Sequence, residues 1–291
     1  MPTLIKGKEL AQEMREKLGK RVEKIKNITG RQPGLAVIQV GSDPASSIYV
    51  RNKQKACQAC GIKSFGYELP EDVSQTQLME LIDTLNQDEH VNGILCQLPL
   101  PDHLDEFAVT QSILPDKDVD GFHAVNTGLL SMGRSCLVPC TPAGILAMLK
   151  AYDIPLKGQR CVIVGRSNIV GKPVAQLMLK EHATVTIAHS RTRDLPGLCH
   201  SADILIAAIG KAHFVTPEYV KPGAVVIDVG INRNEAGKVV GDVDFTSVAS
   251  IASAITPVPG GVGPMTIAML LENTFQAYLK QNRVNEEQVD L

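Results

Sequence analysis

Short apolar segments alternate along this chain with longer segments whose apolar residues recur at helical spacing, and this alternation restricts the possible folds most. The short runs have the length and composition of buried strands. They are residues 35–40, 62–69, 91–98, 161–164, 184–188, 203–209 and 224–229. Because strands that alternate with helices form parallel sheets covered by helices, the sequence predicts an α/β fold.

The segments between these runs predict helices. The first thirty residues carry apolar residues at helical spacing, and a second helix is expected from about Ala45 to Cys60, where Gly61 ends it. Further helices are expected over residues 74–86, from 141 to about 152, after 171, and from about 265 to 281. Residues 98–138 show no regular pattern, and the Gly- and Pro-rich residues 256–266 are expected to form a loop.

Length and composition exclude several classes of protein. The chain has 291 residues, which suggests about two domains. Its net charge of −2 argues against a nucleic-acid-binding protein, which usually has a large basic excess. No apolar run approaches a membrane span and no signal peptide is evident, so we expect a soluble, cytoplasmic protein. Seven cysteines, an odd number, fit reduced thiols better than a disulfide framework.

A strand, a glycine-containing turn and a helix follow one another around residues 161–180. This arrangement presents backbone N–H groups to a pyrophosphate. Ser167 occupies the second position of the G-x-G-x-x-G pattern, and Gly171 falls one residue late. The spacing alone therefore leaves an ordinary strand–helix turn open as the alternative.

The next strand ends before a basic turn. Sites for NAD usually carry an acid there to bind the ribose 2′-hydroxyl, but this chain has Ser190, Arg191 and Arg193 and no acid. Serine and arginine can bind a 2′-phosphate, so we predict a preference for NADP, with Arg166, Ser190 and Arg191 near the phosphate. A solvated basic turn is the alternative.

Two residues of the first half could carry chemistry. Tyr49 and Lys53 lie four residues apart on a predicted helix and therefore share a face. The tyrosine offers a ring for stacking, and a lysine amine can act as an acid or a base. Gln97 follows the third strand, where open α/β sheets bind ligands, so its amide could hold the lysine. Taken alone, such a pair is more often an exposed helix face.

Metal sites are not expected. Asp116, Asp118 and Asp120 alternate before a glycine, but the twelve-residue calcium loop with its terminal glutamate is missing. Cys57 and Cys60 form a C-x-x-C pair late in a predicted helix without the second pair of a zinc site. Two buried thiols are therefore the better interpretation.

Seven segments together are specific for one family. In chain order they read SSIYVRNKQKA, GILCQLPLP, PDKDVDGFH, TPAGI, VIVGRSNIVGKP, DVGIN and TPVPGGVGPMTIAML. From about Ser46 to Glu272 the sequence resembles the bifunctional methylenetetrahydrofolate dehydrogenase/methenyltetrahydrofolate cyclohydrolase family. The resemblance implies oxidation of 5,10-methylenetetrahydrofolate with NADP, followed by hydrolysis of the methenyl product to 10-formyltetrahydrofolate.

The resemblance also implies roles for individual residues. Tyr49 would stack on the aromatic portion of the folate, and Lys53 would be the key catalytic group, hydrogen-bonded by Gln97. Asp120 would anchor the pterin. Further residues expected at the folate are Pro259, Gly260, Gly261 and Pro264. The residues expected at NADP are Gly165, Arg166, Ser167, Ser190, Arg191 and Ile231.

The implied architecture has two α/β domains with a folate cleft between them. The catalytic domain is expected over residues 1–140 and 267–291 and the Rossmann-type NADP-binding domain over residues 141–266. A homodimer formed through the cofactor domain is implied as well. Three alternatives stay open: an NADP-dependent dehydrogenase of another metabolite, of shikimate type; a non-catalytic NADP-binding regulatory protein; and a family member that retains only the dehydrogenase activity.

Overall fold

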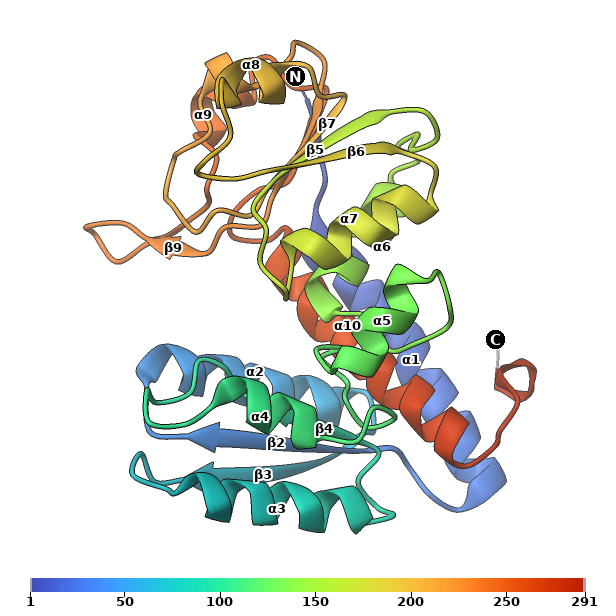
Figure 1. Cartoon of the computed structure of the whole chain (residues 1–291). Helices are drawn as coiled ribbons and strands as arrows, with labels where there is room; N and C mark the ends of the chain where they lie inside the picture. Colours follow the sequence, from blue (N-terminus) through green and yellow to red (C-terminus); the bar gives the residue numbers. More distant parts are fainter. Residues whose placement is uncertain (1, 290–291) are drawn as a thin grey trace. The chain divides into compact units, whose positions relative to one another are not determined.

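The computed structural model describes residues 2–289, with the side chains of residues 44–46 outside the description, and divides the chain into two compact units (Figure 1). Unit 1 comprises Met1–Ala11, Leu130–Gly133 and Thr141–Thr266. Unit 2 comprises Gln12–Leu129, Arg134–Cys140 and Ile267–Leu291. Each unit contains a parallel sheet with helices, so the predicted α/β fold is confirmed.

Unit 2 is built on a three-stranded parallel sheet. Its strands, in spatial order, are β3 (Lys63–Leu69), β2 (Gly34–Val40) and β4 (Gly93–Cys96). Its helices are α1 (Gly7–Thr29), α2 (Pro44–Ala59), α3 (Gln75–Gln87), α4 (Glu106–Ser112), α5 (Ala124–Ser131) and α10 (Val262–Gln281). The first turns of α1 and α10 and the last two residues of α5 belong to unit 1.

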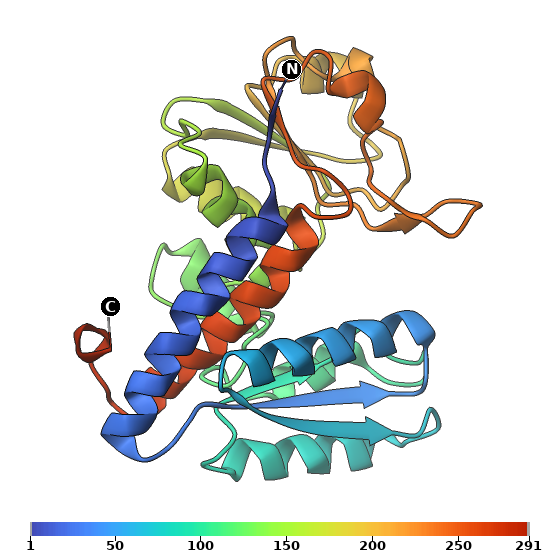
Figure 2. The ribbon, with the colours of Figure 1, turned by 180° about the vertical axis from the view of Figure 1, so that it is seen from behind.

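Two apolar cores lie on opposite faces of this sheet because alternate residues of β2 point to opposite sides. Leu35 and Val37 pack with side chains of α1, α2 and α10. Ala36 and Ile38 pack with side chains of α3 and α4. Figure 2 shows α1 (blue) running alongside α10 (red) on the first of these faces. The sheet is therefore covered on both sides, as parallel sheets require.

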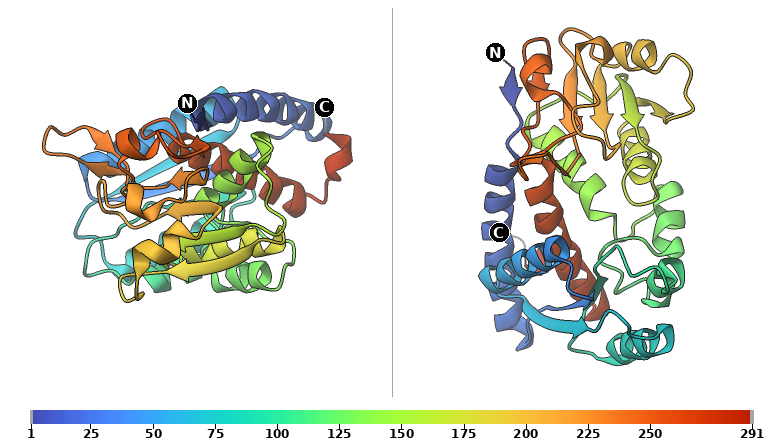
Figure 3. Two further views of the ribbon diagram at one scale, coloured as in Figure 1. Left: turned by 90° about the horizontal axis from the view of Figure 1, so that it is seen from above. Right: turned by 90° about the vertical axis from the view of Figure 1, so that its left-hand side faces the viewer.

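Unit 1 contains a six-stranded parallel sheet (Figure 3). Its strands, in spatial order, are β1 (Thr3–Leu4), β11 (Ala254–Ile255), β8 (Val225–Asp228), β7 (Ile204–Ala207), β5 (Arg160–Val164) and β6 (Thr184–Ala188). Along the chain, β6 is added on one side of β5 and β7 on the other. The strand order thus reverses at β5, which is where doubly wound sheets bind ligands.

Helices cover both faces of this larger sheet (Figure 1). Helices α8 (Leu195–His200) and α9 (Phe245–Val248) contribute to the core on one face. Helices α6 (Cys140–Ala151) and α7 (Gly171–Lys180) lie on the other. A short antiparallel hairpin, β9 (Asn232–Arg233) with β10 (Val239–Val240), follows β8.

The structure differs from the sequence-based expectation in several places. Residues 98–138, which show no regular pattern, contain helices α4 and α5, and Leu130–Gly133 belong to unit 1 instead of the domain over residues 1–140. Strand β1 pairs with β11, so the first residues belong to unit 1, whereas they were expected in the domain over residues 1–140. Helix α10 begins at Val262, so the prediction of a loop through residue 266 is wrong at its end. Pro264 lies in the first turn of this helix, where its missing N–H has no intrahelical partner to lose.

None of the helices in residues 2–289 combines the length and the apolar character required to cross a bilayer.

Candidate functional site

Helix α2 and the end of strand β4 bring Lys53 and Gln97 together. The Nζ atom of Lys53 donates a hydrogen bond to Oε1 of Gln97 at 2.8 Å. The amide nitrogen of Gln97 donates to the carbonyl oxygen of Leu98 at 2.7 Å, which keeps its oxygen directed at the lysine. Both side chains are half-buried. The hydrogen bond predicted between Lys53 and Gln97 is confirmed.

The charge of Lys53 acts on the carboxyl group of Asp120. Burial raises the pKa of the Asp120 carboxyl to about 6, the positive charge of Lys53 lowers it, and the nearby Asp118 adds to the increase. A carboxyl with this pKa can exist in either protonation state near neutral pH.

Asp118 holds the turn that carries Asp120. Its buried carboxylate accepts hydrogen bonds from the backbone N–H groups of Phe122 at 3.2 Å and His123 at 2.8 Å. It also accepts one from Nδ2 of Asn126 at 2.9 Å. Burial raises the pKa of Asp118, and these donors act against the increase. The sequence predicted only that Asp118 holds no metal, and this anchoring role was missed.

Asn273 of helix α10 supports the same turn from the other side. Its Nδ2 donates to the carbonyl oxygens of Val119 and Val138, each at 2.8 Å. The thiol of Cys140 donates to the Val119 carbonyl at 3.2 Å, and burial raises the pKa of this thiol well above its usual value. Both residues were missed, because a contact between residues 119 and 273 leaves no local pattern in the sequence.

Tyr49 lies one helical turn before Lys53 on α2, and 37% of its surface is exposed. Unit 2 thus presents a phenol ring, an amine held by an amide oxygen, and a carboxyl with a pKa of about 6. Such a set can stack on a ring, bind a polar heterocycle and move a proton. Within residues 2–289 no three His, Cys, Asp or Glu side chains are grouped to hold a metal ion. Cys57 and Cys60 are buried thiols, as predicted.

In unit 1 the turn between β5 and α7 is shaped by Gly165. Its φ is +140°, and a Cβ atom there would lie 2.2 Å from the carbonyl oxygen of Ala208, so only glycine fits. Ser167 closes the turn, since its Oγ accepts from the N–H groups of Val170 at 3.1 Å and Gly171 at 3.3 Å. Its hydroxyl proton is not used in these bonds. Arg166 and Ser167 are exposed in the turn that precedes α7.

The other predicted cofactor residues follow neighbouring strands. Ser190 and Arg191 are exposed just after β6, and Ile231, 51% exposed, follows β8. Because these strands are parallel to β5, their carboxyl ends share one edge of the sheet. His189 belongs to the turn itself: its N–H donates to Oγ1 of Thr192 at 2.9 Å, and its Nδ1 accepts from the N–H of Arg191 at 3.1 Å.

Pro259, Gly260 and Gly261 precede helix α10 in unit 1, and Pro264 lies in its first turn. The carbonyl oxygen of Gly260 accepts a hydrogen bond from the N–H of Lys8 at 2.9 Å, which ties this segment to the start of α1. These four residues belong to a different unit from Lys53, Gln97 and Asp120.

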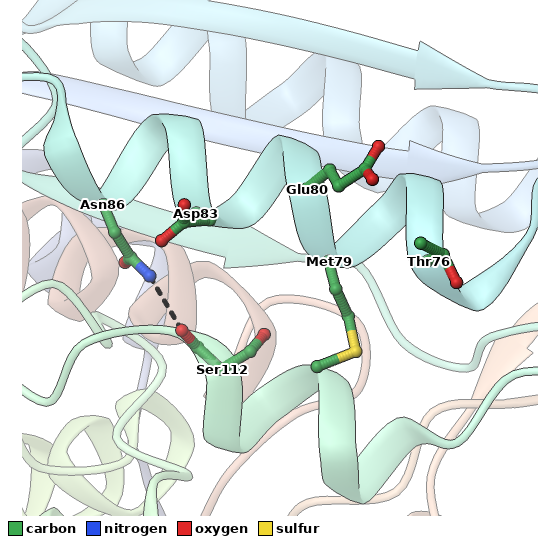
Figure 4. Close-up of a pocket in the computed structure, with 6 residues that line it drawn as sticks. All are labelled: Thr76, Met79, Glu80, Asp83, Asn86 and Ser112. Carbon is green, nitrogen blue, oxygen red and sulfur yellow. Dashed lines mark hydrogen bonds between the residues drawn. The ribbon is translucent and has the colours of Figure 1, made fainter.

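A separate pocket of about 440 Å³ lies between α3 and α4 (Figure 4). Asn86 and Ser112 close one end through a hydrogen bond of 2.8 Å from Nδ2 of Asn86 to the Ser112 carbonyl. The remaining lining residues are Thr76, Met79, Glu80 and Asp83. The lining includes none of the predicted site residues, so this pocket takes no part in the site.

Comparisons with known proteins identify one family. The catalytic-domain model of the tetrahydrofolate dehydrogenase/cyclohydrolase family matches residues 5–120, and the NAD(P)-binding-domain model of that family matches residues 139–282. The bifunctional protein FolD of Streptococcus gordonii is 56% identical over 278 residues, which cover 96% of this chain and 98% of that protein.

Solved structures agree. The bifunctional FolD methylenetetrahydrofolate dehydrogenase/cyclohydrolase of Campylobacter jejuni has 50% identity and a TM-score of 0.95, covering 97% of this chain and 100% of that chain. The Trypanosoma brucei methylenetetrahydrofolate dehydrogenase-cyclohydrolase, complexed with NADP cofactor and inhibitor, has 39% identity and a TM-score of 0.93. That match covers 97% of this chain and 99% of the other.

We expect Lys53→Met to raise the pKa of Asp120 above 6, because the substitution removes the positive charge that favours the ionised carboxylate. Carbon-13 NMR titration of the aspartate carboxyl groups from about pH 4 to about pH 8 measures the midpoint, and Asp120→Asn assigns the signal. Lys55→Met, at an exposed lysine of the same helix, should leave the midpoint unchanged. An unchanged midpoint in Lys53→Met would show that the two charges are not coupled.

Proposed function

The chain belongs to the tetrahydrofolate dehydrogenase/cyclohydrolase family, and from this premise we propose that its two reactions share the site formed by Lys53, Gln97 and Asp120. It oxidises 5,10-methylenetetrahydrofolate with NADP and hydrolyses the methenyl product to 10-formyltetrahydrofolate. The observation that carries the site assignment is the 2.8 Å hydrogen bond between Lys53 and Gln97 in the electrostatic environment of Asp120. Family membership sets aside a shikimate-type dehydrogenase and a regulatory protein.

The hydrolytic step needs a group that handles protons. The methenyl substrate is a cation, so water adds to its bridging carbon with formation of a C–O bond and loss of a proton. A C–N bond of the bridge then breaks: the released nitrogen gains a proton, and the added hydroxyl loses one and becomes the formyl carbonyl, so that one proton is released overall. In our proposal the Lys53 amine takes up or passes on the proton of the attacking water. The Gln97 oxygen keeps Nζ in place for this step.

Binding of the folate is assigned to the neighbouring side chains. The exposed ring of Tyr49 stacks on the aromatic portion of the substrate. The carboxylate of Asp120 accepts hydrogen bonds from pterin N–H groups, and charge-assisted bonds of this kind orient a ring firmly. Pro259, Gly260, Gly261 and Pro264 stay predicted folate-binding residues from the resemblance.

We expect Lys53→Met to lower the cyclohydrolase rate by about 100-fold or more, since a positioned acid or base contributes about 10²–10⁴ to a rate. Its folate affinity should change by no more than about threefold, because stacking and the pterin contacts remain. The absorbance decay of methenyltetrahydrofolate measures the rate, and calorimetry measures the affinity. Lys55→Met, with the same change on the same helix, is the control. Unchanged hydrolysis in Lys53→Met would remove Lys53 from the mechanism.

The edge of the unit 1 sheet is assigned to NADP, which accepts the hydride in the oxidation. The turn between β5 and α7 is assigned to the pyrophosphate because Ser167 has a hydroxyl proton to donate there and the helix dipole favours negative charge. The N–H groups of Val170, Gly171 and Lys172 are already bound by Ser167. The turn after β6 offers Ser190 and Arg191 and no carboxylate, which suits a 2′-phosphate. Arg166 adds a second guanidinium near that phosphate, and Ile231 completes the site.

Replacing Ser190 and Arg191 together by alanine should lower kcat/KM for NADP by about 10–100-fold, because each residue supplies a charge-assisted hydrogen bond to the 2′-phosphate. The value for NAD, which lacks that phosphate, should stay within about twofold. Arg193→Ala, two residues further along the same turn, is the matched control. An equal loss with both cofactors would show that the turn does not select NADP.

We also propose a cytoplasmic homodimer formed through unit 1. Strand β6 is the last strand of its sheet, and Thr184, Thr186 and Ile187 on it are exposed. An uncovered edge strand with an exposed apolar residue is suited to pairing with a second copy. Leu179, near the end of α7 and five residues before β6 in the sequence, is 59% exposed and adds apolar surface. The buried thiols of Cys57 and Cys60 fit a reducing compartment.

Ile187→Lys should convert the dimer to a monomer at micromolar concentration, because it places a charge on the apolar part of the proposed interface. Sedimentation velocity measures the change in mass. Val125→Lys, at an exposed apolar residue of unit 2, is the control and should not alter the mass. A dimer that persists in Ile187→Lys would locate the interface elsewhere.

A further inference from the structure

One buried carboxylate of unit 1 holds the loop that follows strand β7. Asp242, which is fully buried, accepts hydrogen bonds at Oδ2 from the N–H groups of Ile209 at 2.6 Å and Gly210 at 3.0 Å. Its Oδ1 accepts from the N–H of Lys211 at 2.9 Å. Three consecutive backbone donors are thus bound by a single side chain, so the position of this loop depends on Asp242.

The same carboxylate reaches the segment that follows β8. Oδ1 of Asp242 also accepts from Nδ2 of Asn232 at 2.9 Å. Asn232 comes directly after Ile231, whose side chain is exposed at the edge of the sheet. Asp242 therefore connects the loops that follow two neighbouring strands.

Asp228, the last residue of β8, fixes Asp242 in turn. Its Oδ1 accepts from the N–H groups of Asp242 at 2.8 Å and Gly230 at 3.0 Å. Its Oδ2 accepts from the N–H of Val243 at 3.0 Å. The backbone at Asp242 is thereby anchored to β8, a central strand of the sheet.

The strand order indicates which part of a dinucleotide meets these loops. The proposed function assigns the pyrophosphate to the turn after β5 and the 2′-phosphate to the turn after β6. Strands β7 and β8 lie on the other side of β5. A dinucleotide bound where the strand order reverses extends its second half over that side, which here is the nicotinamide half.

We propose that Asp242 is a positioning residue for the nicotinamide half of NADP, acting through the loop of residues 209–211 and, by way of Asn232, through Ile231. Asp242 itself is buried and makes no contact with the cofactor in this arrangement. Consecutive backbone N–H groups around a residue with positive φ, here Gly210 at +74°, form a concavity that binds anions. By occupying this concavity, the Asp242 carboxylate also keeps the phosphates of NADP from binding there. The inference rests on the proposed cofactor site.

Binding of two ligands tests the positioning role of Asp242. NADP carries the nicotinamide half, whereas 2′,5′-ADP carries only the adenosine and the two phosphates nearest to it. Asp242→Asn keeps the shape of the side chain but places an NH₂ group against N–H donors, so the loop should lose its fixed position. Calorimetry should show about tenfold weaker binding of NADP and 2′,5′-ADP binding unchanged within about twofold.

Two further variants keep the test decisive. Asn232→Ala removes only one hydrogen bond, so it should weaken the binding of NADP by about threefold and leave the binding of 2′,5′-ADP unchanged. This variant decides the question if Asp242→Asn does not fold. Asp203→Asn makes the same change at the opposite edge of the sheet, where Asp203 accepts from the N–H of Arg160 and from Nζ of Lys221. It should change neither affinity. Cyclohydrolase turnover without NADP confirms that unit 2 is intact in every variant.

The outcomes separate the inference from the function on which it rests. A loss of equal size for both ligands, or no loss in either variant, would overturn the role of Asp242 and leave the cofactor site standing. Failure of the unaltered protein to bind both ligands would instead overturn the cofactor site, and the inference with it.

Discussion

In each unit the strands of the main sheet are parallel, so their carboxyl ends gather at one edge, and the proposed chemistry of the protein depends on this constraint. Gln97 follows β4 in unit 2, and Ser190 and Ile231 follow β6 and β8 in unit 1. Residues just beyond a strand no longer need to pair in the ladder, so their side chains and N–H groups can meet a ligand.

The aspartates that hold or line the proposed sites differ in burial. Asp118, Asp228 and Asp242 are buried, and each accepts three or four hydrogen bonds, most of them from backbone N–H groups. Such bonds offset the cost of removing a charge from water, and in return the loops that donate them become fixed. Asp120 is only half-buried and lies near the charge of Lys53, so its carboxyl can bind a ligand. The buried acids therefore position the turn that carries Asp120 and the segments that follow β7 and β8.

Much of the fold followed from the periodicity of apolar residues. Periodicity could not reveal very short strands or contacts between residues far apart in the sequence. Strand β6 was predicted with its observed bounds because β-branched residues fill a run between turn residues, but it was expected to be buried and most of its side chains are exposed. Strands β1 and β11 have two residues each, too few to carry any pattern. Tyr49 and Lys53 were found from their helical spacing and the family resemblance. Asn273 and Asp242 were not, because their hydrogen bonds join residues 154 and 33 positions apart.

The unusual glycine spacing after β5 shows why a contact is a better guide than a motif. In the dinucleotide fingerprint the third glycine allows the helix to pack closely on the strand. Here Gly171 does so one residue late: a Cβ atom on it would lie 2.3 Å from the carbonyl oxygen of Gly165. The added residue is accommodated because Ser167, in the place of the second glycine, accepts hydrogen bonds from the N–H groups of both Val170 and Gly171. The turn thus keeps the close packing of the helix on the strand, and the hydroxyl of Ser167 takes the place of bare backbone at the second glycine position.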